Sequence, residues 1–152
     1  MLIIYQNIYK PLQKKKLKQK GFQDSDIWIL LSIIHTHGNK GASLEDLIRG
    51  ADYINKTIPT ISEIEGAINR FLESGIINIV NGKFILTDAT MKDYEAISQK
   101  TKSYLEQWDL LEKLLIKKHF KKQKFIKYII TNDIYKEAYE KYHDKFNRLT
   151  QK

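Results

Sequence analysis

The sequence of 152 residues contains no cysteine. This excludes disulfide bonds, thiol catalysis and every zinc or iron–sulfur site that needs a cysteine ligand. Long apolar runs are also absent, since the longest, residues 27–34, is far shorter than the roughly 18 residues that cross a membrane. The chain opens with apolar residues before basic ones, the reverse of the order in a secretory signal. We therefore expect a cytoplasmic protein with no membrane partner.

Motifs of catalysis are missing as well. The sequence has no phosphate-binding glycine motif, no nucleophile elbow and no zinc-binding helix motif. His35 and His37 are two residues apart and so lie on different faces of a helix, while His119 and His143 are isolated. We expect no enzyme, no cofactor, no metal ligand and no catalytic residue.

The charge of the chain is distributed unevenly. The net charge is +8, but residues 1–20 hold six lysines and no acid, residues 21–100 sum to −4, and residues 101–152 sum to +6. Any affinity for a polyanion therefore belongs to the two ends and not to the acidic centre. Lysine outnumbers arginine 23 to 3, so the coding bias of an AT-rich genome explains part of this charge equally well.

The centre of the chain has the pattern of three helices. Apolar residues recur at helical spacing over residues 24–37, which predicts the first helix. Ser43 and Asp46 have the spacing of a capping box, which predicts the start of a second helix. A second box, Thr60 and Glu63, predicts the start of a third helix.

A β-hairpin is predicted after the third helix. Two β-rich runs, residues 76–80 and 83–87, flank Asn81 and Gly82, the strongest two-residue turn signal. Counting outward from this turn gives three opposed pairs: Val80 with Lys83, Ile79 with Phe84, and Ile77 with Leu86. The last two pairs share a face, which we expect to bury against the helices.

Three helices followed by a tight hairpin give residues 24–88 a family resemblance. With Ser-Leu-Glu-Asp-Leu-Ile at 43–48, Phe-Leu-Glu-Ser-Gly-Ile-Ile at 71–77 and Leu-Thr closing the hairpin at 86–87, this region resembles the winged helix-turn-helix domain of bacterial transcription regulators. The fold expected is α+β, mostly α, with a three-helix winged-helix domain, a two-stranded wing and long C-terminal helices. The domains expected are a basic N-terminal arm (1–22), the winged-helix domain (23–88) and a C-terminal helical region for dimerisation or a helical hairpin (89–152).

This resemblance implies that the third helix enters the major groove and that the wing contacts phosphate or the minor groove. The candidate DNA-binding residues are then Ser62, Asn69 and Arg70 on the helix and Lys83 on the wing, with Asn69 suited to adenine and Arg70 to guanine. Three carboxylates share that helix face and oppose a phosphate-lined groove, so a solvated amphipathic helix is the alternative. Gly66 is either a tolerated glycine or a small patch against which another backbone packs.

Two lysine-rich segments are further candidates for phosphate contact. Residues 117–127 contain six lysines, which form a ridge if the segment is helical. The candidates there are Lys117, Lys118, Lys121, Lys122 and Lys124. The alternative is an ordinary solvated face. Residues 14–20 are either a flexible arm that adds phosphate contacts or a disordered extension.

The C-terminal region shows two apolar seams. From Thr90 the pattern predicts one helix of about 30 residues with a heptad seam, which needs a partner surface. The members of this seam, our candidate dimerisation residues, are Tyr94, Ile97, Tyr104, Trp108, Leu111 and Leu115. A second seam steps through Tyr135, Tyr139, Tyr142, Phe146 and Leu149. The two seams can pair within one chain, but we favour a homodimer joined by the first seam.

These observations lead to two hypotheses. The first is a dimeric winged-helix DNA-binding protein, a transcriptional regulator, whose basic flanks contact the phosphates of double-stranded DNA. The alternative is a winged-helix protein–protein interaction module without sequence-specific DNA binding, in which the acidic face of the third helix and Gly66 dock a protein partner.

Overall fold

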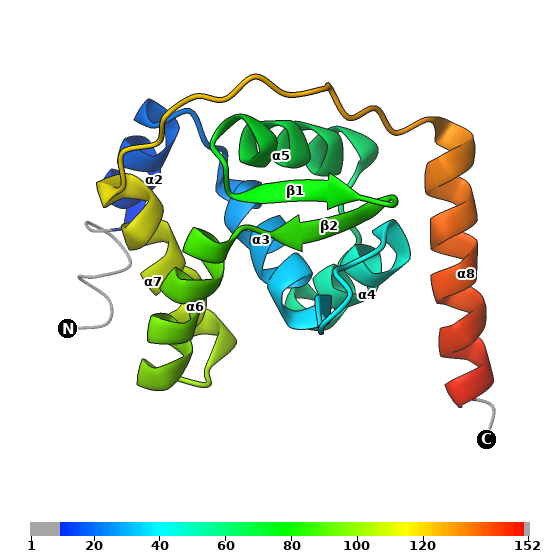
Figure 1. Cartoon of the computed structure of the whole chain (residues 1–152). Helices are drawn as coiled ribbons and strands as arrows, with labels where there is room; N and C mark the ends of the chain where they lie inside the picture. The colour runs from blue at the N-terminus through cyan, green and yellow to red at the C-terminus, as the bar shows by residue number, and fades with distance from the viewer. Residues whose placement is uncertain (1–9, 151–152) are drawn as a thin grey trace.

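The computed structural model describes residues 10–150, which form seven helices and one two-stranded antiparallel sheet (Figure 1). The expected class, α+β and mostly α, is confirmed. The elements are α2 (Lys10–Gln19), α3 (Asp24–Thr36), α4 (Leu44–Asn55), α5 (Ile61–Glu73), β1 (Ile77–Val80), β2 (Lys83–Leu86), α6 (Asp88–Lys100), α7 (Tyr104–Lys117) and α8 (Asn132–Thr150). Residues 1–9 of the expected N-terminal arm and the side chain of Leu149 lie outside the described part. No helix among the described residues has the length and apolar character to cross a membrane.

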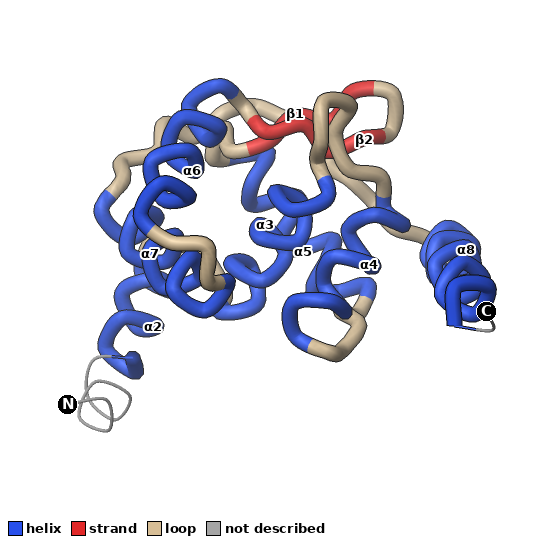
Figure 2. The backbone as a smooth tube through the Cα atoms, turned by 90° about the horizontal axis from the view of Figure 1, so that it is seen from below, coloured by secondary structure: helices blue, strands red, loops and turns tan. Residues whose placement is uncertain are grey.

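Helix α3 lies at the centre of the molecule (Figure 2). Residues 26–34 are all buried, because α4 and α5 pack against one side of the helix while α2 and α7 pack against the other. The sequence pattern predicted a single apolar stripe, but a helix that is covered all round needs apolar residues on every face. Part of the expected N-terminal arm is thus a helix of the core, with Leu17 of α2 fully buried.

Both predicted capping boxes are present. Ser43 Oγ accepts from the Asp46 amide at 3.0 Å, and Asp46 Oδ2 accepts from the Ser43 amide at 3.0 Å. Thr60 and Glu63 exchange the same two bonds at 3.1 and 3.0 Å. The predicted starts of α4 and α5 are confirmed, since each box satisfies amides that the first turn of a helix leaves unpaired.

The hairpin has the predicted register. Asn81 and Gly82 both have positive φ angles, 52° and 74°, and Ile77 and Phe84 are fully buried on its inner face. Phe84 also forms a β-bridge to Ala42, with amide-to-carbonyl distances of 3.0 and 2.8 Å. Strand β2 therefore lies between β1 and the segment that joins α3 to α4.

The predicted helix of about 30 residues is wrong, because it is two helices. Thr101 is extended, with φ −156°, and Ser103 caps a new helix by accepting from the Glu106 amide, so α7 folds back on α6. The seam residues are buried or half-buried within one chain: Tyr94, Ile97, Tyr104, Trp108, Leu111 and Leu115. The reason for expecting a dimer through this seam is thereby removed.

Helix α8 packs on α4, at the opposite side of the molecule from α6 and α7 (Figures 1 and 2). The pairing of the two seams within one chain is therefore wrong. The Tyr142 hydroxyl donates to Asp52, and Lys145 Nζ lies 2.8 Å from Glu45 Oε1, which joins α8 to α4. The chain must cross the whole molecule between the end of α7 and the start of α8.

Candidate nucleic-acid interface

Residues 118–131 make this crossing and are called the strap here. The strap has no helix or strand and passes over α5 on its way from α7 to α8 (Figure 1). The lysine-rich segment 117–127 is therefore not the helical ridge that its charge spacing allowed. Helix α7 ends at Lys117 and Lys118 is extended. Farther along the strap, the amides of Gln123, Tyr128 and Ile130 donate to α5.

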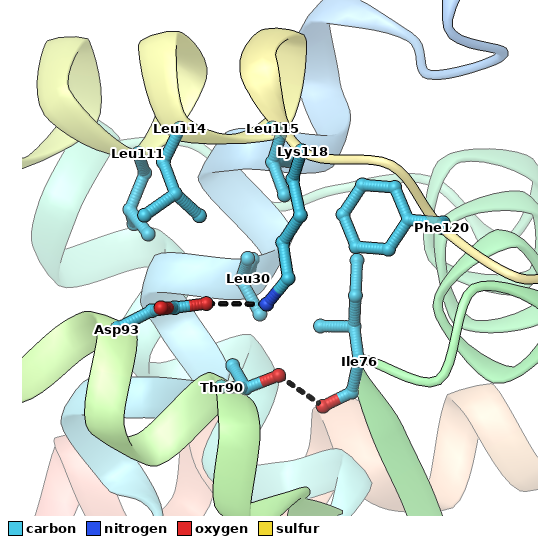
Figure 3. A pocket seen from close by; sticks show the side chains of 9 residues that line it. All are labelled: Leu30, Ile76, Thr90, Asp93, Leu111, Leu114, Leu115, Lys118 and Phe120. Atoms are coloured by element: carbon cyan, nitrogen blue, oxygen red, sulfur yellow. Dashed lines mark hydrogen bonds and ion pairs between the residues drawn. The ribbon is translucent and has the colours of Figure 1, made fainter.

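The start of the strap is anchored beside α6 (Figure 3). Lys118 Nζ lies 2.5 Å from Asp93 Oδ2, and the two side chains line a small cavity together with apolar side chains such as Leu30 and Leu111 (Figure 3). The ring of Phe120 meets the ring of Phe22 edge-on, with centroids 5.6 Å apart. Lys118 is thus half-buried and paired, so it anchors the strap rather than facing solvent as a phosphate ligand.

The end of the strap is bound to the outer face of α5. Asn69 donates from Nδ2 to the Tyr128 carbonyl at 2.9 Å and accepts at Oδ1 from the Tyr128 amide at 2.8 Å. Glu65 Oε2 accepts from the Ile130 amide at 2.8 Å. The polar face of α5 that was expected to read DNA therefore holds the strap.

The middle of the strap contacts the C-terminal end of α5. The Gln123 amide donates to the Glu73 carbonyl at 2.7 Å, and Lys122 Nζ lies 3.8 Å from Glu73 Oε1. The Gln123 side chain rests on Gly75, where a Cβ atom would lie 2.6 Å from its Nε2. This glycine, with φ 71°, permits both the end of α5 and the close passage of the strap.

Arg70 points into the molecule rather than outward. Its Nε and Nη2 donate to the two oxygens of Asp26 at 2.7 and 2.8 Å, and Asp26 is fully buried. The guanidinium crosses Gly66, where a Cβ would lie 3.0 Å from it. Neither Asn69 nor Arg70 is available to a base in this arrangement. Of the two readings of Gly66, the patch for another backbone is contradicted, because the Arg70 guanidinium occupies that space. Of the three candidates on α5, Ser62 is exposed.

The ion pair of Asp26 with Arg70 was missed by the sequence reasoning, although one signal for it exists. Asp26 stands in the first turn of an almost wholly apolar helix, and its carboxylate also accepts from the Gln23 amide at 2.9 Å. A carboxylate on a helix that is buried all round needs a cationic partner.

The strap brings together the two lysine-rich segments of the sequence. Lys20, just after α2, donates to the Lys118 carbonyl at 3.4 Å, and Lys16 of α2 lines the same groove as Lys117. The exposed lysines of residues 14–20, of the end of α7 and of the strap are called the lysine surface here. They are Lys14, Lys15, Lys16, Lys18, Lys20, Lys117, Lys121, Lys122, Lys124 and Lys127. Lys83 is half-buried on β2, opposite Val80.

The charge of these two segments is concentrated. Residues 10–20 and 117–127 contain twelve of the 26 basic residues and no acid, which leaves fourteen basic residues against eighteen acids, a net −4, for the rest of the chain. Segregated charge of this kind produces a positive potential over one region and attracts polyanions.

No family model, curated protein or solved structure matches this chain. Among the described residues there is no group of three or more histidine or acidic side chains that could hold a metal ion.

Proposed function

We propose that this chain is a winged-helix protein that binds double-stranded DNA through its lysine surface, as a regulator without catalytic activity in the cytoplasm. The order of elements supports the winged-helix assignment: α3, the bridge at Ala42, α4, α5 and then the hairpin. In such domains the third helix and the wing face the DNA.

One observation carries the proposal: the lysine-rich strap lies over the helix that faces DNA in that fold. A duplex that approaches α5 from the side of the strap meets the strap before it meets the helix (Figure 1), and Lys121, Lys122 and Lys124 of the strap are exposed. Lysine contacts to phosphate supply affinity without sequence information. Because the side chains of Asn69 and Arg70 are engaged within the protein, binding is expected to be nearly independent of sequence.

The experiment is a titration of fluorescent duplexes of different sequence at several salt concentrations. Wild type is expected to bind all of them, with log K falling by about 0.9 per neutralised phosphate for each unit of log salt concentration. Lys121→Glu with Lys122→Glu should weaken binding at least about tenfold and lower the salt slope by about 2.

The matched control is Lys100→Glu with Lys102→Glu, at the last residue of α6 and in the turn before α7, away from the strap (Figure 1). It changes the net charge equally, so an equal loss of affinity would assign binding to net charge and not to the lysine surface. Absence of duplex binding by wild type at 50 mM salt would eliminate the proposal.

The structure weakens the argument for docking a protein on the acidic face of α5. Glu63 caps the helix, Glu65 binds the Ile130 amide, and Glu73 contacts the strap through its carbonyl and carboxylate. The acidic groups on which that alternative depends are used within the chain.

A further inference from the structure

The strap exposes two large apolar side chains among its lysines. Ile126 is 92% exposed, the highest value for a large hydrophobic side chain in the described part of the chain, and Phe125 is 40% exposed. Contiguous apolar groups in water mark interaction sites. Both residues lie in the run Lys124-Phe-Ile-Lys127, so a cation flanks them on each side.

The hairpin extends this apolar surface. Phe125 and Ile126 line a shallow groove together with Leu72 of α5 and with Ile79 and Val80 of β1. Val80, beside the hairpin turn, is 53% exposed. The strap and the hairpin therefore bring apolar side chains together in one groove, which Asn78, Gln123 and the two lysines also line.

Residues 124–127 are fixed at both ends. On one side the Gln123 amide bonds to the Glu73 carbonyl, and on the other Tyr128 bonds to Asn69. A segment that is already ordered loses little entropy when it binds. The three steps from Lys124 to Lys127 cover at most about 10 Å at roughly 3.3 Å each, which corresponds to about three base steps of 3.4 Å along one strand.

We propose that Phe125 and Ile126 form an apolar wedge that enters a base step of the bound duplex while Lys124 and Lys127 contact the flanking phosphates. Apolar side chains that enter the minor groove in this way unstack the bases and bend the DNA. This inference rests on the proposed function, and it adds that the preferred ligand is a duplex that bends or unstacks easily.

The extent of the lysine surface favours DNA over an acidic peptide or a lipid surface. Residues 118–127, which hold the lysines of the strap, span up to about 33 Å, using roughly 3.3 Å per residue, and residues 14–20 continue the positive charge beyond the start of the strap. A DNA duplex carries evenly spaced phosphates along its length, so it can contact the whole length of the lysine surface. A lipid surface favours a broad apolar face on a helix, and the wedge is narrow.

The test compares a perfect duplex with the same duplex carrying one central mismatch, for affinity and for bending measured by energy transfer between dyes at the two ends. Wild type is expected to bend both duplexes and to bind the mismatched one about tenfold more tightly, because its unstacking cost is lower. Phe125→Ala with Ile126→Ala should abolish the bend and the preference for the mismatch. It should keep the salt slope, since the lysines remain.

The control is Leu105→Ala, which removes a side chain that is 71% exposed at the start of α7, and it should alter neither bend nor affinity. Ile126 is almost wholly exposed, and Phe125 lies at the surface against the hairpin, outside the central core. Circular dichroism should therefore show that the double variant keeps its helices. Duplex binding without a bend, or bending by the double variant, would overturn the wedge and leave DNA binding intact. Failure of wild type to bind any duplex, with binding to phosphatidylserine vesicles instead, would overturn both proposals.

Discussion

The central helices and the strap differ in where their charged groups lie: they are buried and paired in the centre and exposed to water in the strap. Within the centre, Asp26 is fully buried and both of its oxygens accept from Arg70. In the strap, backbone groups bond to α5 while Lys121, Lys122, Lys124 and Lys127 extend into water. Helix α5 takes part in both regions, since Arg70 faces inward and Asn69 faces the strap.

This difference separates the source of stability from the source of affinity. Charges paired in the core fix how α3 and α5 pack, and they are not available to a ligand. Charges on the strap add little to folding, because exposed ion pairs contribute at most about 1 kcal/mol. Substitutions in the two regions should therefore affect different measurements.

The largest effect is expected from Asp26→Ala. This change leaves the Arg70 guanidinium without its partner and removes the acceptor of the Gln23 amide. Breaking such a pair costs about 3 kcal/mol, near the lower end of the usual range because Arg70 is 27% exposed. Urea denaturation measures the loss. Asp144→Ala, at an exposed position of α8, is the control and should change the stability by less than about 0.5 kcal/mol. Equal losses in the two variants would show that the ion pair contributes nothing.

A smaller and more local effect is expected from Asn69→Ala. The change removes both bonds to Tyr128, at about 1 kcal/mol each, so the strap should open while α3, α4 and α5 stay folded. Hydrogen exchange should show the amides of Tyr128 and Ile130 exchanging at least about tenfold faster.

The control for this variant is Ser62→Ala, which alters an exposed residue of the same helix away from these bonds. If exchange at both amides is unchanged in Asn69→Ala, the strap is held by contacts other than those of Asn69, such as those of Glu65 and Glu73.

The parts of the fold that the sequence predicted are local ones. The two capping boxes join residues three apart, and the register of the hairpin follows from its two-residue turn. The break between α6 and α7 was also readable, because Ser103 and Glu106 have capping-box spacing. The heptad pattern was instead interpreted as one continuous helix. Two helices joined by a turn can carry the same apolar pattern and pack against each other within one chain.

The strap and the position of α2 were beyond local patterns. Asn69 and Tyr128 are 59 residues apart, Arg70 and Asp26 are 44 apart, and Lys20 and Lys118 are 98 apart. Charge spacing identified residues 117–127 as a basic segment, but the backbone of that segment takes its conformation from α5. The shape of this candidate interface is therefore set by hydrogen bonds between the strap and α5, which is distant in the sequence, and local patterns do not predict such bonds.

The smallest effect concerns α8 and depends on pH. Burial, and then the hydrogen bond and charge of Asp52, raise the pKa of Tyr142 to about 12. The neutral phenol donates to Asp52, so its contribution to stability is complete below the unfolded pKa of about 10 and is lost as the pH rises through 12. Tyr142→Phe should lower the free energy of unfolding by about 1 kcal/mol at pH 8, and the difference from wild type should shrink between pH 10 and 12. Urea denaturation of both proteins at each pH measures this difference. The lysines titrate in both proteins alike, so their contribution drops out of the comparison.

The control is Tyr53→Phe, at a position that is 72% exposed, which should differ from wild type by the same small amount at every pH. If the difference in the free energy of unfolding between Tyr142→Phe and wild type stays constant from pH 8 to 12, the hydrogen bond from Tyr142 to Asp52 does not stabilise the packing of α8 on α4.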